Sequence, residues 1–212
     1  MNTNTQTEHG KIFAEMLSLR ISGYKKFYGC KTMPIDIYDH FSHQLLLSEC
    51  INGHELFLAC VRFVSLEECD KHNTVFLPLA RVSADTENKS LKDDLLEVIN
   101  SRKGNNLYYN SSLTISPSIK TFKKNNEVLK TIIGAALAYH QFLDSKNWLT
   151  SAPIKVRTDK LFKRLGYKSF GTNAYYLLKT LNNEKTILLR HQQENHTYRS
   201  WLNGAKNLWK KE

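Results

Sequence analysis

Apolar and polar residues along the chain follow two spacings, one typical of helices and one typical of strands. Between residues 11 and 27 the apolar side chains recur mainly at intervals of three and four, which predicts a helix. Two strand-like runs follow at Gln44–Cys50 and Glu55–Val64, and Asn52-Gly53 between them suits a tight turn that requires positive φ. From Leu56 to Val64 the second run is apolar except for Arg62, so we expect a central strand that is covered on both faces.

The rest of the chain alternates between predicted helices and predicted strands. Helices are predicted at Leu91–Ile99, Glu127–Leu143 and Asp159–Leu165. Strands are predicted at Thr74–Leu77, Leu107–Ser116 and Pro153–Val156. Residues 36–43 are expected to form a turn or a short helix, and residues 1–10 a disordered tail. This alternation of helices and strands is typical of the α/β and α+β classes.

Length and composition narrow the class further. The 212 residues suffice for one well-buried domain, and 41% hydrophobic with 11% aromatic residues exclude a disordered or fibrous chain. No apolar run approaches the roughly 20 residues of a membrane span, and the polar N-terminus does not resemble a secretion signal. The four cysteines show no C-x-x-C spacing, which fits a reducing compartment. We therefore expect a soluble cytoplasmic protein.

The charge is distributed unevenly over the two halves of the chain. Residues 1–100 hold 10 Lys and Arg against 14 Asp and Glu, whereas residues 101–212 hold 20 against 6, a net charge of +14. Such an excess predicts an anionic partner for the C-terminal half: nucleic acid, a phosphorylated cofactor, an acidic carrier protein or a membrane surface. A general solubility charge is the alternative.

Arg62 is the one charged residue in an apolar strand, and a buried charge is costly unless it is paired. Asp36 and Asp39 lie upstream and are the candidate partners, in a functional site or in a purely structural ion pair. Together with His40 and His43, these carboxylates have a spacing that would share one helix face and reach a divalent ion. The spacing matches no established ligand motif, so no metal is expected.

A basic segment, Lys120–Asn126, comes after a predicted strand and leads into a predicted helix. Backbone amides at a helix N-terminus, together with Lys120, Lys123 and Lys124, would form an anion site for phosphate groups. The segment has no glycine, and a solvated lysine turn is the alternative. A C-terminal helix with Trp201 and Trp209 is expected either to pack on its own domain or to contact a membrane or partner.

In their order along the chain, these features resemble the GNAT superfamily of acyl-CoA N-acyltransferases. Within it, the chain is most similar to acyl-homoserine-lactone synthases and long-chain N-acyl amino acid synthases. The resemblance covers about residues 11–170 and rests on Asp36-Ile37-Tyr38-Asp39 with Arg62 and on Arg164-Leu165-Gly166-Tyr167. It implies an α+β fold of three layers, in which helices flank a mixed β-sheet splayed at its centre. An acyltransferase-like domain would span residues 11–170, and residues 171–212 would extend it and end in an amphipathic helix.

The resemblance also implies a reaction. A fatty acyl group would move from the phosphopantetheine arm of a donor to a small amine such as an amino acid. The implied donor is acylated acyl carrier protein, and acyl-CoA is the less favoured one. An acidic carrier would give the basic half of the chain a partner. The implied catalytic residues are Arg62, Asp39, Asn110 and Ser112. The implied residues for the acyl-phosphopantetheine donor are Leu113, Thr114, Ile115, Lys120, Lys123 and Lys124, and those for the acceptor are Arg20, Tyr24, Phe27 and Asp36.

Three positions depart from the pattern of these synthases. Asn110-Ser111-Ser112 stands where the branch usually has Glu-Ser-Arg, Lys120–Asn125 lacks the glycines of the cofactor loop, and Phe162 aligns with a tyrosine used as general acid. A water held by Asn110 and Ser112, or an ionised Asp39, would then have to remove the ammonium proton. Two alternatives to an acyltransferase remain open. The first is a catalytically inactive sensor of acyl groups or carrier protein, and the second is a basic nucleic-acid-binding module.

Overall fold

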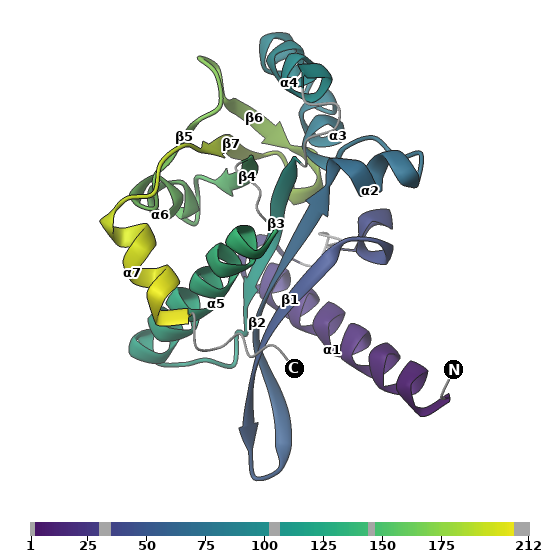
Figure 1. The fold of residues 1–212 in the computed structure, drawn as a ribbon, viewed down its shortest axis with the longest axis vertical. Coiled ribbons are helices and arrows are strands. Elements are labelled where there is room, and N and C mark those ends of the chain that lie inside the picture. The colour runs from purple at the N-terminus through teal and green to yellow at the C-terminus, as the bar shows by residue number, and fades with distance from the viewer. Residues whose placement is uncertain (1–2, 30–34, 102–106, 144–146, 206–212) are drawn as a thin grey trace.

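The computed structural model describes residues 3–29, 35–101, 107–143 and 147–205. One mixed sheet of seven strands runs through the centre of the molecule in the order β1-β2-β3-β4-β7-β5, and β6 also pairs with β7 (Figure 1). The strands are β1 (His43–Ile51), β2 (His54–Ser65), β3 (Tyr108–Ile115), β4 (Trp148–Pro153), β5 (Tyr167–Ser169), β6 (Tyr175–Leu178) and β7 (Glu184–His191).

Helices cover both faces of this sheet. The α-helices are α1 (Thr3–Tyr28), α2 (Leu66–Lys71), α3 (Leu77–Ser83), α4 (Lys89–Ser101), α5 (Phe122–Phe142), α6 (Thr158–Arg164) and α7 (His196–Ala205). Two short 3₁₀ helices are η1 (Ile37–His40) and η2 (Lys179–Leu181). One buried apolar cluster joins α5, α6 and α7 to the sheet, and a second joins α3 and α4 to its opposite face. The predicted three-layer α+β architecture is confirmed.

The sheet opens at its centre, as the resemblance implied. The parallel strands β3 and β4 pair only over Tyr108–Asn110 and Trp148–Thr150, and beyond these residues they have no ladder between them. On its other side β3 pairs with β2 through Ile115, so β3 stays in the β1-β2-β3 arm of the sheet. A gap in the hydrogen-bonded ladder therefore lies beside residues 111–115 of β3.

Most local predictions agree with the structure. Asn52 and Gly53 form the turn of the β1-β2 hairpin with φ values of 52° and 78°, which is the left-handed geometry that favours these residue types. Strand β2 is buried from Leu58 to its end, as its apolar run predicted. Gly166, with φ at 90°, follows α6 and lets the chain leave the helix.

Three element predictions are wrong, each for a local reason. Residues 77–83 form α3 and not the end of a strand, because a proline in the first helical turn lacks only an N–H that the helix does not use. The basic segment is already helical from Phe122, since the Thr121 hydroxyl accepts a hydrogen bond from the Lys124 amide and caps α5. The predicted strand at Pro153–Val156 is misplaced, because β4 ends at Pro153.

Both ends of the chain are more integrated than expected. Residues 3–10, predicted to be a disordered tail, belong to α1, because extending an existing helix costs far less than starting one. Residues after 170 contribute to the same sheet, because β7 lies between β4 and β5. Helix α7 packs on α5, where the Trp201 carbonyl approaches Gly134 more closely than a side chain would allow. Trp209 lies outside the described residues.

Candidate functional site

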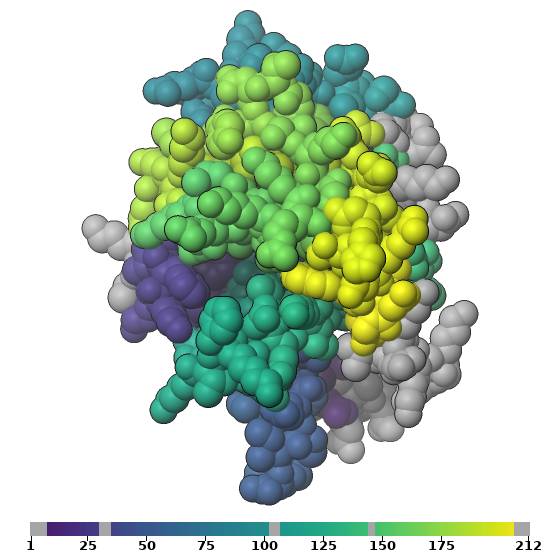
Figure 2. Space-filling model, turned by 90° about the vertical axis from the view of Figure 1, so that its left-hand side faces the viewer, coloured from purple at the N-terminus to yellow at the C-terminus, as the bar shows by residue number. Residues whose placement is uncertain are grey.

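A cavity of about 1280 Å³ lies at the opening between β3 and β4. Figure 2 shows the molecule hollowed on the face where α1, α6 and the start of α5 meet. Residues of all three helices line the cavity, among them Phe27 of α1, Lys160 of α6 and Phe122 of α5. The cavity reaches the interior of the sheet at Asn110, where the pairing of β3 with β4 ends.

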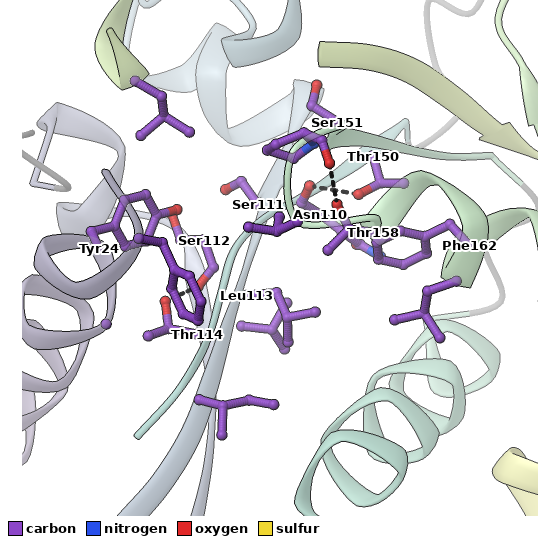
Figure 3. Close-up of a pocket in the computed structure, with 18 of the residues that line it drawn as sticks. Tyr24, Asn110, Ser111, Ser112, Leu113, Thr114, Thr150, Ser151, Thr158 and Phe162 are labelled. Atoms are coloured by element: carbon purple, nitrogen blue, oxygen red, sulfur yellow. Dashed lines mark hydrogen bonds between the residues drawn. The ribbon is translucent and has the colours of Figure 1, made fainter. Parts of the chain in front are cut away.

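The two ends of the cavity differ in chemistry. One end lies on the α5 face of the sheet and is apolar; it is lined by Leu113, Leu129, Ile132, Ile133, Ala136, Leu137 and Phe162. The other end lies on the α3 face and is aromatic and charged; it is lined by Tyr24, Tyr28, Asp36, Tyr38 and Arg81. Between them stand the polar side chains of the diverging strands, which are Asn110, Ser111, Ser112, Thr150 and Ser151 (Figure 3).

A β-bulge shapes β3 beside the opening. Cys60 of β2 is opposite Thr114, but Arg62 is opposite Ser111, so β3 carries one residue more than β2 in this interval. Ser112 takes up the extra length with φ at 56°. The additional residue in a bulge is left out of the ladder. The Ser112 carbonyl accepts a hydrogen bond from the Thr114 hydroxyl at 3.1 Å, and both residues line the cavity.

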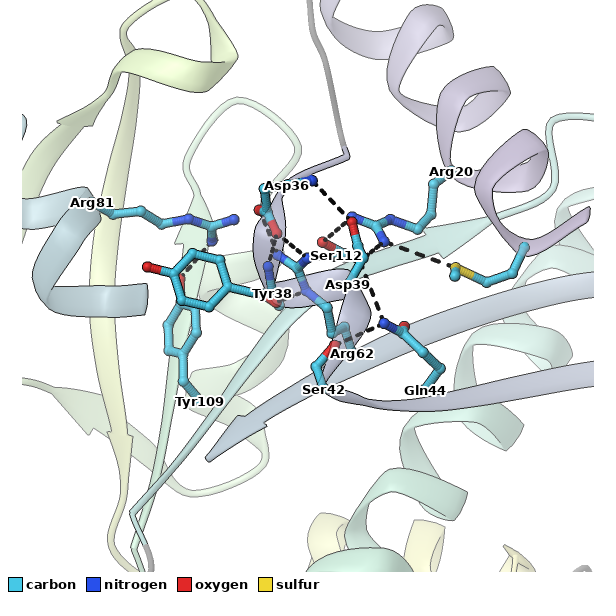
Figure 4. A network of polar contacts seen from close by, with 12 residues as sticks. Arg20, Asp36, Tyr38, Asp39, Ser42, Gln44, Arg62, Arg81, Tyr109 and Ser112 are labelled. Carbon is cyan, nitrogen blue, oxygen red and sulfur yellow. Dashed lines mark hydrogen bonds and ion pairs between the residues drawn. The ribbon is translucent and has the colours of Figure 1, made fainter. Parts of the chain in front are cut away.

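A buried ion network lies behind the cavity wall (Figure 4). The Arg62 guanidinium donates from Nη1 to Asp36 Oδ1 at 2.5 Å and to Asp39 Oδ1 at 2.7 Å, and from Nη2 to Asp36 Oδ2 at 3.0 Å. Arg20 of α1 also pairs with Asp39. The side chains of Arg20, Arg62 and Asp39 are at most 1% exposed, so this is a fully desolvated cluster.

The network also holds the bulged strand. Arg62 Nε donates to Ser111 Oγ at 3.0 Å, and Arg20 Nη2 donates to Ser112 Oγ at 3.2 Å. Burial alone would raise the pKa of Asp39, but Arg62 and Arg20 outweigh it and lower that pKa below its usual value. Asp39 is therefore an ionised structural partner of two arginines.

The structure brings eight of the predicted site residues to the cavity. They are Tyr24, Phe27, Asp36, Asn110, Ser112, Leu113, Thr114 and Ile115. Arg20, Asp39 and Arg62 do not line it; they lie behind the wall and act on Asp36 and on the β3 serines. This geometry does not support Asp39 as a base that contacts a bound amine.

The predicted lysine site is not part of the cavity wall. Lys120 and Lys123 are exposed, and Lys124 pairs with Glu49 of β1 at 2.8 Å. The basic residues that do line the cavity lie mainly around α6; the full set is Lys26, Arg81, Lys155, Arg157, Lys160, Arg164 and Lys179. Most of them belong to the basic C-terminal half of the chain, and Lys120, Lys123 and Lys124 are not among them.

His140 is a partner of the Asn110 side chain that sequence reasoning missed. His140 of α5 is 2% exposed, stacks on Trp148 and has its Nε2 3.2 Å from Asn110 Nδ2. Burial lowers the pKa of His140 well below its ordinary value, so the ring is neutral and accepts the hydrogen bond from the amide. Asn110 Oδ1 is buried without a hydrogen-bond partner in the described part of the chain, at the inner end of the cavity. The amide is thus held in one orientation.

Asp36, Asp39, His40 and His43 do not form a metal site. Both carboxylates are engaged by arginines, and within the described ranges no three His, Cys, Asp or Glu side chains come close enough to share an ion. None of the described helices combines the length and apolarity needed to cross a membrane.

The mixed sheet with helices on both faces is similar to the folds of solved acyltransferring synthases. Two solved structures show the same fold: FeeM, an N-acyl amino acid synthase from uncultured soil microbes, and LasI, an AHL synthase. FeeM has a TM-score of 0.53 at 11% identity over 86% of this chain and 90% of its own. LasI has a TM-score of 0.52 at 21% identity over 92% and 89%. No family model and no curated protein sequence matches the chain.

Proposed function

We propose that the protein is an N-acyltransferase that moves a fatty acyl group from a phosphopantetheine thioester to an amine and forms an amide. The observation that carries this proposal is the cavity itself, which joins an apolar end to a polar, charged end through the gap between β3 and β4. Both similar structures, FeeM and LasI, are named as acyl-product synthases, which supports the same class of reaction.

The acyl chain would occupy the apolar end. Ile132, Ile133 and Leu137 of α5 are each at most 3% exposed, so the wall here is dry and apolar. Burying a methylene group in such a place stabilises a complex by about 0.8 kcal/mol. A long acyl chain therefore provides most of the binding free energy, and the pantetheine arm would run along Leu113, Thr114 and Ile115 at the edge of β3.

The donor would enter the cavity past the basic side chains around α6, which we call the basic mouth. Lys155, Arg157, Lys160 and Arg164 line the cavity on its α6 side, and they would meet the phosphate of the arm. Acyl carrier protein is the donor that we propose, because its acidic surface complements a half-chain with a net charge of +14. Acyl-CoA is the alternative donor.

The chemistry needs no covalent enzyme intermediate. The amine nitrogen attacks the thioester carbonyl, the C–N bond forms, the C–S bond breaks, and the pantetheine sulfur leaves as a thiol after taking up a proton. Backbone N–H groups at the β3 bulge, beside the cavity, would stabilise the oxyanion. A water held by Asn110 and Ser112 would remove the proton from the amine. Arg62, Arg20 and Asp39 would act as positioning residues, because they hold the β3 serines and Asp36.

A catalytically inactive sensor on the same fold is the second candidate. It is favoured by Asn110 and Phe162, since an amide is a weak base and a phenyl ring cannot donate a proton. Nucleic-acid binding stays a prediction from charge, and retention on DNA or RNA that falls steeply with salt would support it.

The test is to incubate the protein with acylated carrier protein, or with acyl-CoA, and a mixture of amino acids. Release of free thiol together with a new amide mass supports the acyltransferase. Saturable donor binding without release supports the sensor, and neither binding nor release refutes both. Leu113→Trp should block the cavity and abolish release. Leu56→Trp is the matched control, because Leu56 is 43% exposed and lies outside the cavity.

A further inference from the structure

Arg81 is the guanidinium that lines the α3 end of the cavity. It stands on α3, in a run of apolar residues, and its Nη1 donates to the Tyr109 hydroxyl at 2.8 Å. The guanidinium carbon also lies 5.5 Å from the centre of the Tyr109 ring. Figure 4 shows the side chain reaching from α3 toward Tyr38 and Asp36. Its position is therefore fixed at one end by an aromatic support.

Unlike Arg20 and Arg62, Arg81 forms no ion pair with a carboxylate among the residues that the structure describes. Arg20 and Arg62 are both paired with carboxylates, whereas no Asp or Glu of the described residues comes within ion-pair distance of Arg81. A partly buried cation without a counter-ion is unfavourable, and one Nη1 hydrogen bond leaves further N–H donors of the planar fork for a ligand. This arrangement is typical of a site whose anion arrives with the substrate.

The same cavity wall offers a carboxylate. Asp36 lines the cavity with 34% of its side chain exposed, and Arg62 holds it from behind. Asp36, Tyr38 and Arg81 all line this end of the cavity, and Figure 4 shows Asp36 and Arg81 beside Tyr38. A wall with one accessible carboxylate and one accessible guanidinium complements a molecule that carries an ammonium group and a carboxylate.

We infer that Arg81 binds the carboxylate of the acceptor, and that the acceptor is an amino acid. This inference rests on the proposed acyl transfer and adds the group that selects the substrate. A guanidinium binds a carboxylate through two parallel hydrogen bonds, and Tyr109 keeps the fork in the required plane. Cationic amines without a carboxylate would be repelled by Arg81, which provides discrimination as well as affinity.

The experiment compares each amino acid with its own primary carboxamide, which keeps the amine and the side chain and removes the negative charge. In the native protein the carboxylate form should have a KM lower by about 10- to 100-fold, the range of a charge-assisted hydrogen bond. Arg81→Met should remove this preference by raising the KM of the amino acid while leaving that of the carboxamide within about threefold. Arg81→Lys should restore part of it, and Tyr109→Phe, which keeps the arginine, should weaken it only slightly.

Arg199→Met is the matched control, because it removes the same charge from a side chain that is 69% exposed and outside the cavity. Its preference for carboxylates should be that of the native protein. Equal use of amino acids and carboxamides by the native protein, or an unchanged preference in Arg81→Met, would overturn the inference. Thermal stabilisation of the protein by the amino acids but not by their carboxamides, lost in Arg81→Met, supports the carboxylate site even without turnover. In that case the proposed reaction fails and the site stands; no stabilisation and no turnover refutes both.

Discussion

Replacing Arg62 with methionine should destabilise the protein strongly, because it removes the main cation of the buried network. Arg62 is fully buried and contacts both Asp36 and Asp39, while Arg20 alone would remain beside Asp39. Methionine has a similar length and fills the space, so the change isolates the charge. The perturbation therefore leaves the buried Asp39 with Arg20 as its one remaining cation of the network and leaves Asp36, which is 34% exposed, without its Arg62 partner.

The expected loss of stability follows from the complete burial of Arg62 and Asp39. Removing one member of a buried ion pair costs about 3–5 kcal/mol, and a domain of this kind is stable by only about 5–15 kcal/mol. The Ser111 hydrogen bond to Arg62 Nε is lost as well, which adds to the cost. Urea unfolding should show a midpoint far below that of the native protein with an unchanged slope.

The free energy of unfolding of the native protein and that of Arg62→Met should depend differently on pH. In the native protein Arg62 and Arg20 outweigh burial and lower the pKa of Asp39, so its contribution is present at neutral pH and is lost as the pH falls through that lowered value. In Arg62→Met we expect burial to dominate and to raise the pKa of Asp39. The free-energy difference between the two proteins should then shrink between pH 7 and pH 4.5, because the variant protonates Asp39 first.

The double variant Arg62→Met with Asp39→Asn tests the cause, since it removes one buried cation and one buried carboxylate and leaves Arg20 and Asp36 as the remaining charges of the network. It should regain part of the lost stability at pH 7 and show no such pH dependence. Lys71→Met, which breaks an exposed ion pair with Glu67, is the control and should leave the midpoint unchanged. A loss below about 1 kcal/mol for Arg62→Met, or a deficit independent of pH, would refute the reasoning.

Three further predictions concern packing, protonation and chain length. Gly23→Ala should lower the free energy of unfolding by about 1–3 kcal/mol, since its Cβ would clash with the Thr114 methyl group; urea unfolding measures this. His140→Gln should flatten the loss of stability below pH 6.5, because burial lowers the pKa of His140 and only the unfolded state gains the proton there. Ala136→Phe should shift donor preference to shorter acyl chains by filling the apolar end, as turnover against chain length would show.

Each of these has an internal check. Gly10→Ala, in the same helix but with open space around it, should instead raise stability by about 0.5–1 kcal/mol. A loss of stability in Gly10→Ala as large as that in Gly23→Ala would show that helix packing on Thr114 is not the cause. If His140→Gln lost stability below pH 6.5 as steeply as the native protein, the prediction for His140 would be wrong. If Ala136→Phe kept the native preference for acyl-chain length, the prediction for Ala136 would be wrong.

Several local features of the fold could be predicted from the sequence, because each depends on interactions between neighbouring residues. The Asn52-Gly53 turn, the apolar run of β2 and the Gly166 stop each depend on a few neighbouring residues, so they could be predicted without the fold. The burial of Arg62 was also predictable, because a lone charge in an apolar strand requires a partner that the upstream carboxylates can provide.

Only the tertiary structure decided which of these residues reach a ligand. Arg62 and Asp39 lie behind the cavity wall, whereas Arg81, on a segment for which neither a helix nor a site residue was predicted, lines it. The basic mouth comes from the α6 region and not from Lys120–Lys124, although both segments carry the same kind of charge. The reason is that a side chain's access to a cavity depends on how distant strands diverge and on which helix covers the gap. Neither is encoded in the spacing of neighbouring residues.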